Sequence, residues 1–247
     1  MSSHERMLSI LDLFDASRPY WTFDDLSAEL GYSRSTLYRH LKILSDAELL
    51  TTLSGLGYTL GPRIIELDYQ IRISDPLVRI AQPIMEELVG RFSGVALLCR
   101  RYRRSVICVH QVSSGDTVRS QYERGLRRPF FRGAASVIIL AHLGGGQIGK
   151  LYDDQPEGFA ASNLGSSLPQ VKAQLKAIRE QGWAITTGEV TAGNTGIACP
   201  LFDGRGEIIG SLSLTSASTS MTDSRIEQIA DQMVFCAKII NNALAQA

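Results

Sequence analysis

The stretch Ser33-Arg34-Ser35-Thr36-Leu37-Tyr38-Arg39-His40-Leu41-Lys42 decides the fold of the N-terminal part of this chain. Leu37, Leu41 and Leu44 recur at helical spacing and predict one apolar stripe along a helix. The opposite face carries cations, which contact phosphates, and polar groups, which contact base edges. The stretch therefore has the chemistry of a recognition helix that enters a groove of DNA.

Two shorter segments in front of this stretch complete a helical arrangement. Thr22 and Asp25 have the spacing of a capping box and predict the start of a helix, with Gly31 at its end. An earlier helix is predicted from four apolar residues at helical spacing, Met7, Ile10, Leu11 and Phe14. Three helices with a short turn before the third predict a helix-turn-helix.

A pair of short extended runs follows the third helix. Residues 49–53 and 58–60 flank 54–57, whose two glycines predict a tight turn. A hairpin in this place is typical of the wing that lies along the DNA backbone. The alternative is a small helical domain that contacts protein, but the wing and the basic outer face favour DNA. The predicted DNA-contacting residues are Ser33, Arg34, Ser35, Thr36, Tyr38, Arg39, His40 and Lys42.

Composition excludes several classes of protein. The 247 residues are 44% hydrophobic and 20% charged, and no apolar run approaches the ~20 residues that span a bilayer. The N-terminal residues lack the basic flank and apolar core of a signal peptide, so we expect a cytoplasmic protein. The four cysteines and four histidines have no metal-ligand spacing, and we predict no metal and no cofactor.

Charge is unevenly distributed along a chain whose net charge is zero. Residues 1–75 hold 7 Lys or Arg and 11 Asp or Glu, a net charge of −4. Residues 76–132 carry +7 and residues 133–247 carry −3. The helix-turn-helix region is therefore acidic overall, which argues against nucleic acid. Its basic groups are concentrated on the third helix, so we expect a local positive face there.

The remainder of the chain alternates between strands and helices. Pro62 begins an amphipathic helix that links the domains, and Asp75-Pro76 predicts the start of the next helix. Strands are predicted at 95–99, 106–112, 118–122, 183–187, 197–202 and 208–214, and helices at 134–143, 168–181 and from Thr222 onward. This order predicts a mainly antiparallel sheet flanked by helices. The predicted domains are 1–61, a linker helix at 62–75, and 76–247.

Three segments of the second domain carry groups suited to a ligand. Residues 127–136 bring Arg127, Arg128 and Arg132 to the start of a helix, and both guanidinium groups and helix N-termini bind carboxylates. Residues 186–196 form a polar loop, and strand 211–215 places alternate hydroxyls on one face. In the alternative interpretation those hydroxyls face solvent, the phenylalanines at 130 and 131 belong to the core, and the arginine cluster at 100–104 is a solvated turn. That cluster could instead contact DNA or a neighbouring subunit.

Several of these runs resemble the IclR family of bacterial transcription regulators. The resemblance lies in residues 8–14 and 33–41 and in Gly57-Tyr58-Thr59-Leu60-Gly61-Pro62-Arg63-Ile64-Ile65-Glu66-Leu67, and it continues through 182–185 and 198–203. It covers nearly the whole chain. It implies an α+β fold with an N-terminal winged helix-turn-helix, a linker helix and a C-terminal GAF-like α/β effector-binding domain. It also implies a homodimer or a dimer of dimers (a homotetramer).

The resemblance further implies which residues surround the effector, often a small organic acid in this family. By position these are Ala134, Ala135, Thr186, Gly196, Ser213 and Thr215. The sequence departs from the family at two of these positions. Thr186 stands where relatives often have an acidic residue, and Gly196 stands where they often have a cysteine. Phe130, Phe131 and Arg132 stand in a run that usually has the sequence Pro-Leu-His-Ala-Thr-Ala. These departures indicate a larger ligand, such as an aromatic carboxylate, contacted also by Arg127, Arg128, Phe130 and Arg132.

The sequence thus predicts a ligand-responsive transcription regulator that binds a roughly palindromic double-stranded operator as a dimer. It would control a catabolic operon in response to a small organic acid, with aromatic acids among the candidates. One alternative is a constitutive DNA-binding dimer whose second domain is purely structural. Another is a small-molecule enzyme, which is disfavoured because the sequence has no nucleophile elbow, Walker motif or Rossmann fingerprint.

Overall fold

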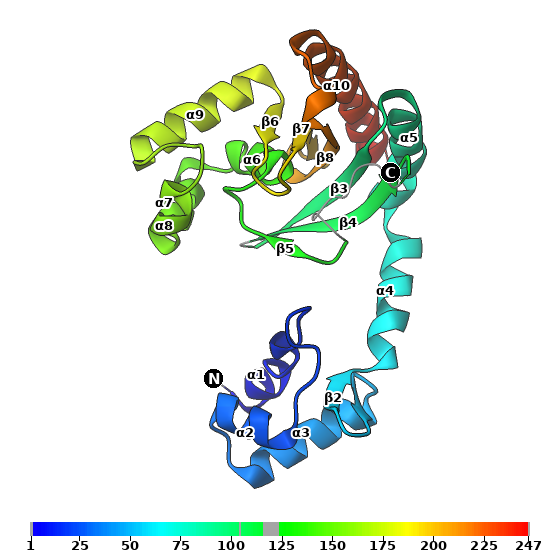
Figure 1. Ribbon diagram of the computed structural model, residues 1–247, viewed down its shortest axis with the longest axis vertical. Coiled ribbons are helices and arrows are strands. Elements are labelled where there is room, and N and C mark those ends of the chain that lie inside the picture. The colour runs from blue at the N-terminus through cyan, green and yellow to red at the C-terminus, as the bar shows by residue number, and fades with distance from the viewer. Residues whose placement is uncertain (1, 104, 116–123, 247) are drawn as a thin grey trace. The chain divides into compact units, whose positions relative to one another are not determined.

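The computed structural model describes residues 2–103, 105–115 and 124–246. The chain forms two compact units, Met1–Ser74 and Asp75–Ala247. The first is helical with a small hairpin, and the second is a sheet covered by helices on both faces (Figure 1). The α+β class predicted from the sequence is confirmed.

The helix-turn-helix forms as predicted. α2 (Phe23–Leu30) begins at a capping box in which Thr22 Oγ1 accepts the Asp25 N–H at 3.2 Å and Asp25 accepts the Thr22 N–H at 3.1 Å. Gly31 ends the helix in the left-handed region at φ 62°, where a side chain would be strained. α3 (Arg34–Asp46) follows at once, capped by the Ser33 hydroxyl.

The first helix is shorter than the sequence predicts. α1 (Ser3–Leu8) ends after two turns, and η1 (Leu11–Leu13) is a separate 3₁₀ turn, so one continuous helix through Phe14 is wrong. The Ser9 hydroxyl donates to the Arg6 carbonyl at 3.0 Å, an alternative to continued helix. The tighter turn that follows leaves Ile10 fully buried in the core.

The predicted hairpin after α3 is confirmed, and Trp21 pairs with its second strand. β1 (Leu50–Leu53) pairs antiparallel with β2 (Gly57–Leu60). Trp21 joins the hairpin by two backbone hydrogen bonds to Tyr58, of 2.8 and 3.0 Å. Gly57 permits this approach, because its φ is 98° and a Cβ there would lie 2.4 Å from the Trp21 carbonyl oxygen. The core beneath is made of Ile10, Trp21, Leu26, Leu37, Leu41, Leu44 and Leu50.

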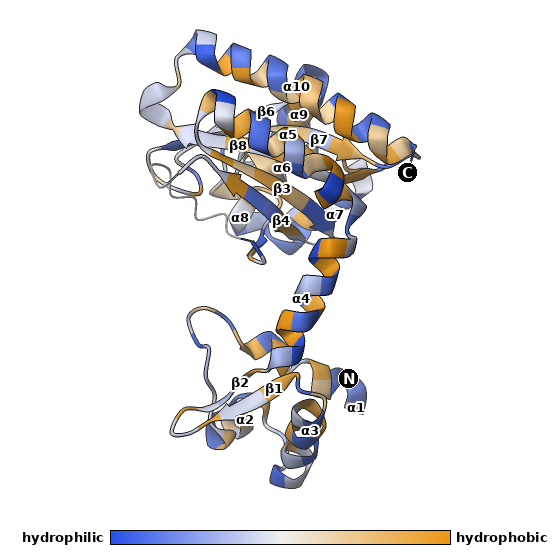
Figure 2. Cartoon of the chain, turned by 90° about the vertical axis from the view of Figure 1, so that its right-hand side faces the viewer, coloured by the Kyte–Doolittle hydropathy of each residue, from blue (hydrophilic) through white to orange (hydrophobic). Residues whose placement is uncertain are grey.

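α4 (Pro62–Ser74) differs from the other long helices because none of its residues is buried. Five apolar or aromatic side chains on it are exposed, Ile65, Leu67, Tyr69, Ile71 and Ile73. Figure 2 shows hydrophobic and hydrophilic residues alternating along this helix. Monomeric proteins rarely expose so many large apolar side chains in one segment.

The described part of the second unit has an antiparallel six-stranded sheet in the order β5-β4-β3-β8-β7-β6. Its strands are β3 (Val95–Tyr102), β4 (Ser105–Ser113), β5 (Arg127–Arg128), β6 (Ala184–Thr187), β7 (Asn194–Phe202) and β8 (Ile208–Ala217). The β7–β8 hairpin turns at Asp203, where the Gly206 N–H donates to the Asp203 carbonyl. The strand predicted at 118–122 lies outside the described residues.

Helices cover the two faces of this sheet (Figure 1). α5 (Pro76–Phe92) and α10 (Asp223–Ala245) pack on one face, against inward side chains such as Leu212 and Leu214. α6 (Ala134–Ala141), α7 (Gly145–Asp154), α8 (Pro156–Ala160) and α9 (Leu168–Gln181) cover the other face. α9 has its predicted bounds, whereas α7, α8 and the short β5 were not predicted. All eight residues of α6 are buried.

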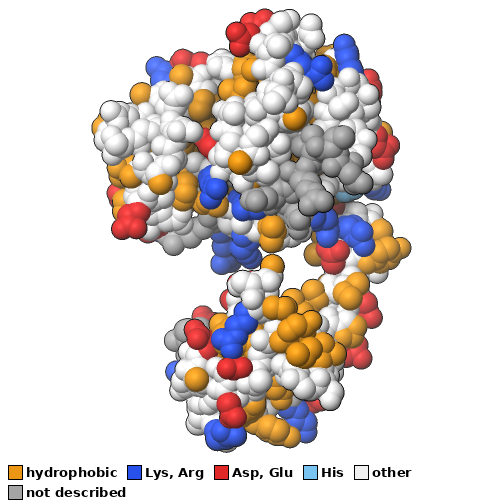
Figure 3. Space-filling model, viewed as in Figure 1, with side chains coloured by type: hydrophobic (Ala, Val, Ile, Leu, Met, Phe, Trp, Pro, Cys, Tyr) orange, Lys and Arg blue, Asp and Glu red, His pale blue; other side chains and the backbone are white. Residues whose placement is uncertain are grey.

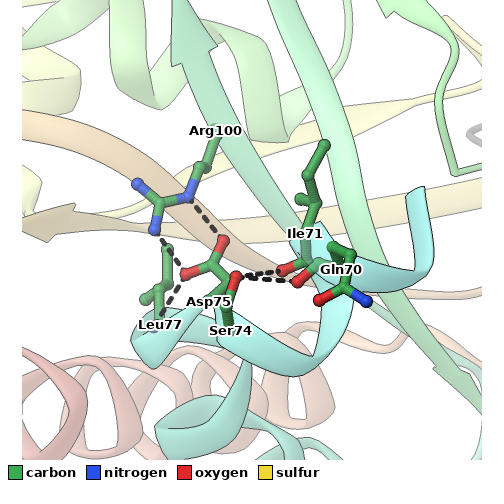
Figure 4. A network of polar contacts seen from close by, with 6 residues as sticks. All are labelled: Gln70, Ile71, Ser74, Asp75, Leu77 and Arg100. Atoms are coloured by element: carbon green, nitrogen blue, oxygen red, sulfur yellow. Dashed lines mark hydrogen bonds and ion pairs between the residues drawn. The ribbon is translucent and has the colours of Figure 1, made fainter. Parts of the chain in front are cut away.

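Asp75 and Arg100 join the start of α5 to β3. The Asp75 carboxylate accepts the Leu77 N–H at 2.9 Å and receives both Arg100 Nε (3.0 Å) and Arg100 Nη2 (2.6 Å), as Figure 4 shows. The two side chains are only 10% and 26% exposed. The interpretation of residues 100–104 as a solvated turn is therefore wrong for Arg100, because a two-point contact holds it against a helix cap.

Substituting Asp75→Ala removes the helix cap and leaves a partly buried guanidinium without its carboxylate. We expect a loss of about 2 kcal/mol in the free energy of unfolding, measured by urea denaturation followed by circular dichroism. Glu180→Ala is the matched control, because its ion pair with Lys176 is exposed on α9. If the two variants lose the same stability, the Asp75–Arg100 contact does not stabilise this unit.

Candidate functional site

α3 presents a polar face because its apolar stripe is buried. Leu37, Leu41 and Leu44 are at most 1% exposed and fix the rotation of the helix. The predicted contact residues Ser33, Arg34, Ser35, Tyr38, Arg39 and Lys42 are exposed, and Thr36 is half-buried. Tyr38 stands out, since 63% of this large side chain is open to solvent.

The cations of the first unit differ in whether they are already paired. Arg34 Nη1 lies 3.0 Å from Asp24 Oδ1, and Arg18, Arg63 and Arg72 each pair with a carboxylate. Among the described residues, Arg39 and Lys42 form no ion pair. A phosphate can therefore bind Arg39 and Lys42 without displacing an internal partner.

His40 does not belong to the exposed face. It is 2% exposed, its ring lies edge-on to Tyr32, and its Nε2 is 3.4 Å from the Ser3 hydroxyl. Burial, with Arg39 and Arg6 nearby, lowers the pKa of His40. A side chain in this position cannot reach a base edge, so the prediction that His40 contacts DNA is corrected. Its ring instead packs α3 against Ser3 of α1.

The wing contributes no positive charge. Residues 50–60 contain neither Lys nor Arg, so contact with a phosphate would use hydroxyl or backbone N–H groups. The hairpin carries only uncharged side chains, and two of its leucines, Leu53 and Leu56, are exposed. Within the described part of this unit, Arg39 and Lys42 on the outer face of α3 are exposed cations that form no ion pair.

A cavity of about 30 Å³ lies in the second unit where the start of α6 meets the sheet. Six of the residues predicted from the family resemblance line it, Ala134, Ala135, Thr186, Gly196, Ser213 and Thr215. They come from α6, β6, β7 and β8, which are far apart in sequence. The cavity is also lined by Leu97, Gly133, Glu189, Val190, Thr191 and Asn194, which sequence reasoning did not single out.

The backbone N–H groups at the start of α6 point toward this cavity lining. The Ala134 N–H donates to Thr186 Oγ1 at 2.9 Å, and the Gly133 N–H donates to Glu189 Oε2 at 2.8 Å. The N-terminus of a helix carries partial positive charge, so it favours an acidic partner. Glu189 is the one acid in the polar loop 186–196, which is the signal by which it could have been found.

Two hydroxyls on β8 face α6 but differ in their bonding. Ser211 is fully buried and donates to the Ala135 carbonyl at 2.8 Å. Ser213 is 2% exposed, lines the cavity, and its Oγ has no hydrogen-bond partner among the described residues. The alternative that these hydroxyls face solvent is wrong. A buried hydroxyl without a partner is costly, so a polar ligand in the cavity would satisfy it.

The other predicted effector contacts do not line this cavity. Phe130 is 2% exposed in the core, so its assignment as a ligand contact is corrected in favour of the core alternative. Arg127 and Arg128 form β5 at the sheet edge, where Arg127 donates to the Ser105 hydroxyl. Arg132 donates from Nε to the Glu189 carbonyl at 2.6 Å and lines an adjacent cavity.

The described residues show no metal-binding cluster and no exposed thiol. They contain no cluster of three His, Cys, Asp or Glu side chains that could hold a metal ion. All four cysteines are buried, and burial raises the pKa of Cys199 to about 12 and raises that of Cys236. A protonated, buried thiol is a poor nucleophile. No described helix is long and apolar enough to cross a membrane.

Two known protein families match two different parts of the chain. The family described as "Bacterial transcriptional regulator IclR C-terminal" matches residues 73–242, and a "Helix-turn-helix domain" family matches residues 3–52. The HTH-type transcriptional regulator XynR of Escherichia coli (strain K12) is 26% identical over 247 residues, covering 99% of this chain and 97% of that protein.

Solved structures show the same fold. The IclR transcriptional regulator from Alicyclobacillus acidocaldarius superposes with a TM-score of 0.82 at 20% identity, covering 98% of each chain. An IclR homolog from Microbacterium hydrocarbonoxydans, solved in complex with 4-hydroxybenzoate, gives a TM-score of 0.79 at 19% identity and covers 100% of both chains.

Alanine substitution of the two serines on β8 should change the free energy of unfolding in different ways. Ser211→Ala removes a satisfied buried hydrogen bond and should cost about 1 kcal/mol of unfolding free energy. Ser213→Ala removes a buried hydroxyl without a partner and should leave stability unchanged or raise it by up to about 1 kcal/mol. Urea denaturation of both variants measures the contrast. Equal losses would mean that Ser213 is bonded in the free protein.

Proposed function

Because this chain belongs to the IclR family of bacterial transcriptional regulators, we propose that it is a ligand-responsive regulator whose second unit binds a small organic acid. The observation that carries this proposal is the gathering of residues from four separate elements around one cavity at the N-terminus of α6. An α-helix N-terminus with hydroxyls around it binds a carboxylate well. The first unit would supply the DNA contact.

The DNA contact proposed is the outer face of α3 in the major groove. It uses Ser33, Arg34, Ser35, Thr36, Tyr38, Arg39 and Lys42, and it omits His40 because that side chain is buried. Arg39 and Lys42 are the central cations, since Arg34 must first release Asp24. An exposed ion pair is weak, so Arg34 is available at small cost.

Self-association is the second part of the proposal. The exposed apolar side chains of α4, visible at the surface in Figure 3, suit a helix of a second copy. On α10, Phe235 and Ile239 are 58% and 41% exposed and would suit a further contact in a dimer of dimers. A dimer presents two copies of α3, so the operator should be roughly palindromic.

The effector class follows from the cavity and from a relative. The hydroxyls of Thr186, Ser213 and Thr215 surround a helix N-terminus, which favours an acid. The Microbacterium hydrocarbonoxydans homolog was solved with 4-hydroxybenzoate, so aromatic acids are the first to test. We propose control of a catabolic operon for such an acid, in the cytoplasm where the operator DNA lies.

The competing function is a constitutive DNA-binding dimer whose second unit only holds the copies together. The buried Ser213 hydroxyl favours a sensor over this alternative, because it lines a polar cavity in which a ligand could bond to it. An enzyme is not supported, since the family consists of regulators.

Arg39→Ala tests the DNA interface. Loss of an unpaired cation at the proposed phosphate or base contact should weaken operator binding by about 10–100-fold, measured by fluorescence anisotropy at fixed salt. Binding of acids to the second unit should be unchanged. Arg205→Ala, in the exposed β7–β8 turn, is the control of equal charge. If the two variants bind operator equally well, α3 does not make the contact.

An operator-binding titration with a panel of aliphatic and aromatic acids tests the sensor. A true effector should raise the melting temperature and change the apparent operator Kd by about 5–150-fold. An acid that raises the melting temperature while leaving operator affinity unchanged would favour the constitutive alternative. Absence of any stabilising acid in the panel would contradict the sensor itself.

A further inference from the structure

The Glu189 carboxylate lies between two adjacent cavities in the second unit. The inner cavity is the one of about 30 Å³ at the start of α6, and the outer cavity has a volume of about 260 Å³. Glu189 lines both. Its Oε2 accepts the Gly133 N–H at 2.8 Å on the inner side, and its Oε1 accepts Asn163 Nδ2 at 2.8 Å on the outer side.

The inner cavity has little free space beside Glu189. A volume of about 30 Å³ holds roughly one or two water molecules, whereas a carboxylate alone has three heavy atoms. Glu189 is also the only ionisable residue among the described lining of this cavity. An acidic ligand that entered beside it would meet a like charge at close range.

Glu189 already makes the contact that a ligand carboxylate would make. Its carboxylate accepts the N–H of Gly133, the residue just before α6, and so lies near the partial positive charge of the helix N-terminus. The buried Ser213 hydroxyl lines the same inner cavity and has no partner among the described residues. The Glu189 carboxylate therefore occupies the start of α6, while the Ser213 hydroxyl in the same cavity stays without a partner among the described residues.

Two glycines bracket the segment of the loop that carries Glu189. Gly188 and Gly193 flank it, both with positive φ (70° and 79°), and a Cβ at either would meet no atom within 4 Å. Backbone hydrogen bonds Gly188 N–H to Asn194 O and Ser218 N–H to Gly193 O hold its two ends. Displacement of Glu189 would require the segment between these glycines to change conformation, and the 2.6 Å bond from Arg132 Nε to the Glu189 carbonyl would have to break or move with it.

The outer cavity has the character of a site for a ring. The half-buried Phe131 ring lies 5.0 Å from the Phe159 ring, centroid to centroid, and offers an apolar surface. Arg132, Ser162 and Asn163 add a cation, a hydroxyl and an amide at the same cavity. Its volume of about 260 Å³ approaches the ~300 Å³ at which small-molecule sites begin.

We propose that Glu189 is an internal carboxylate that occupies the effector's own carboxylate position, and that the effector is an aromatic acid that displaces it. This inference rests on the proposed sensor function. The ligand carboxylate takes over the Gly133 N–H and the Ser213 hydroxyl, and its ring lies in the outer cavity against Phe131. The closed loop lowers the apparent affinity, because only the fraction of molecules with Glu189 displaced can bind.

Glu189→Gln tests this proposal in the full-length protein, with 4-hydroxybenzoate and pyruvate as probes in isothermal titration calorimetry. The amide keeps the size and the acceptor oxygen but removes the competing charge, so 4-hydroxybenzoate should bind about tenfold tighter than it binds the wild type. Glu189→Ala should bind at least as tightly. Glu207→Gln, an exposed glutamate in the β7–β8 turn, should leave affinity unchanged.

A second arm tests the outer cavity. In the Glu189→Gln background, Phe131→Ala should weaken 4-hydroxybenzoate by tenfold or more and leave pyruvate unchanged, because pyruvate has no ring to place there. A thermal melt of each variant confirms that it is folded. Equal losses for both acids, or no loss for either, would overturn the assignment of the outer cavity to a ring.

The outcomes separate this proposal from the sensor function. If wild type binds 4-hydroxybenzoate and Glu189→Gln binds it equally or more weakly, Glu189 is a ligand contact or a bystander, and the displacement model is wrong while the sensor stands. If neither acid binds wild type or any variant and operator affinity is unaffected, the sensor function fails and this inference with it.

Discussion

The complete burial of α6 is the constraint on which the second unit depends. Its eight residues pack between the sheet and the outer helices, so the N–H groups at its start cannot reach bulk water. Buried backbone donors must find acceptors within the protein. Thr186 and Glu189 supply them, from a strand and a loop some fifty residues away. The lining of the polar cavity therefore includes the acceptors at this helix end.

In the first unit, burial likewise decides which polar groups are presented to solvent. Three leucines of α3 are held in the core, and this fixes which residues the helix presents outward. The unit is acidic overall, yet Arg39 and Lys42 on α3 have no carboxylate partner among the described residues. Local pairing, more than the summed charge, therefore decides which face attracts a phosphate. Coulomb interactions between exposed charges fade within about 10 Å at ordinary salt, so distant acids matter little.

Sequence patterns predicted the elements with strong local signals. Capping boxes, glycine stops and apolar periodicity located α2, α3, α9 and the β7–β8 hairpin, because these signals depend on neighbours in the chain. They missed α7 and α8, which begin in a run of glycines and at a proline, residues that are typical of loops and turns. The break after Leu8 was missed because burial of Ile10 overrides helical spacing.

The sequence by itself determined the family, the class of fold and the polar face of α3, since each follows from residue spacing along the chain. Only the tertiary structure decided that His40 and Phe130 are buried and that Arg127 and Arg128 lie at a sheet edge, away from the cavity. It also brought Glu189 to the start of α6. These facts depend on contacts between residues remote in sequence, and no local pattern encodes which partner a side chain meets.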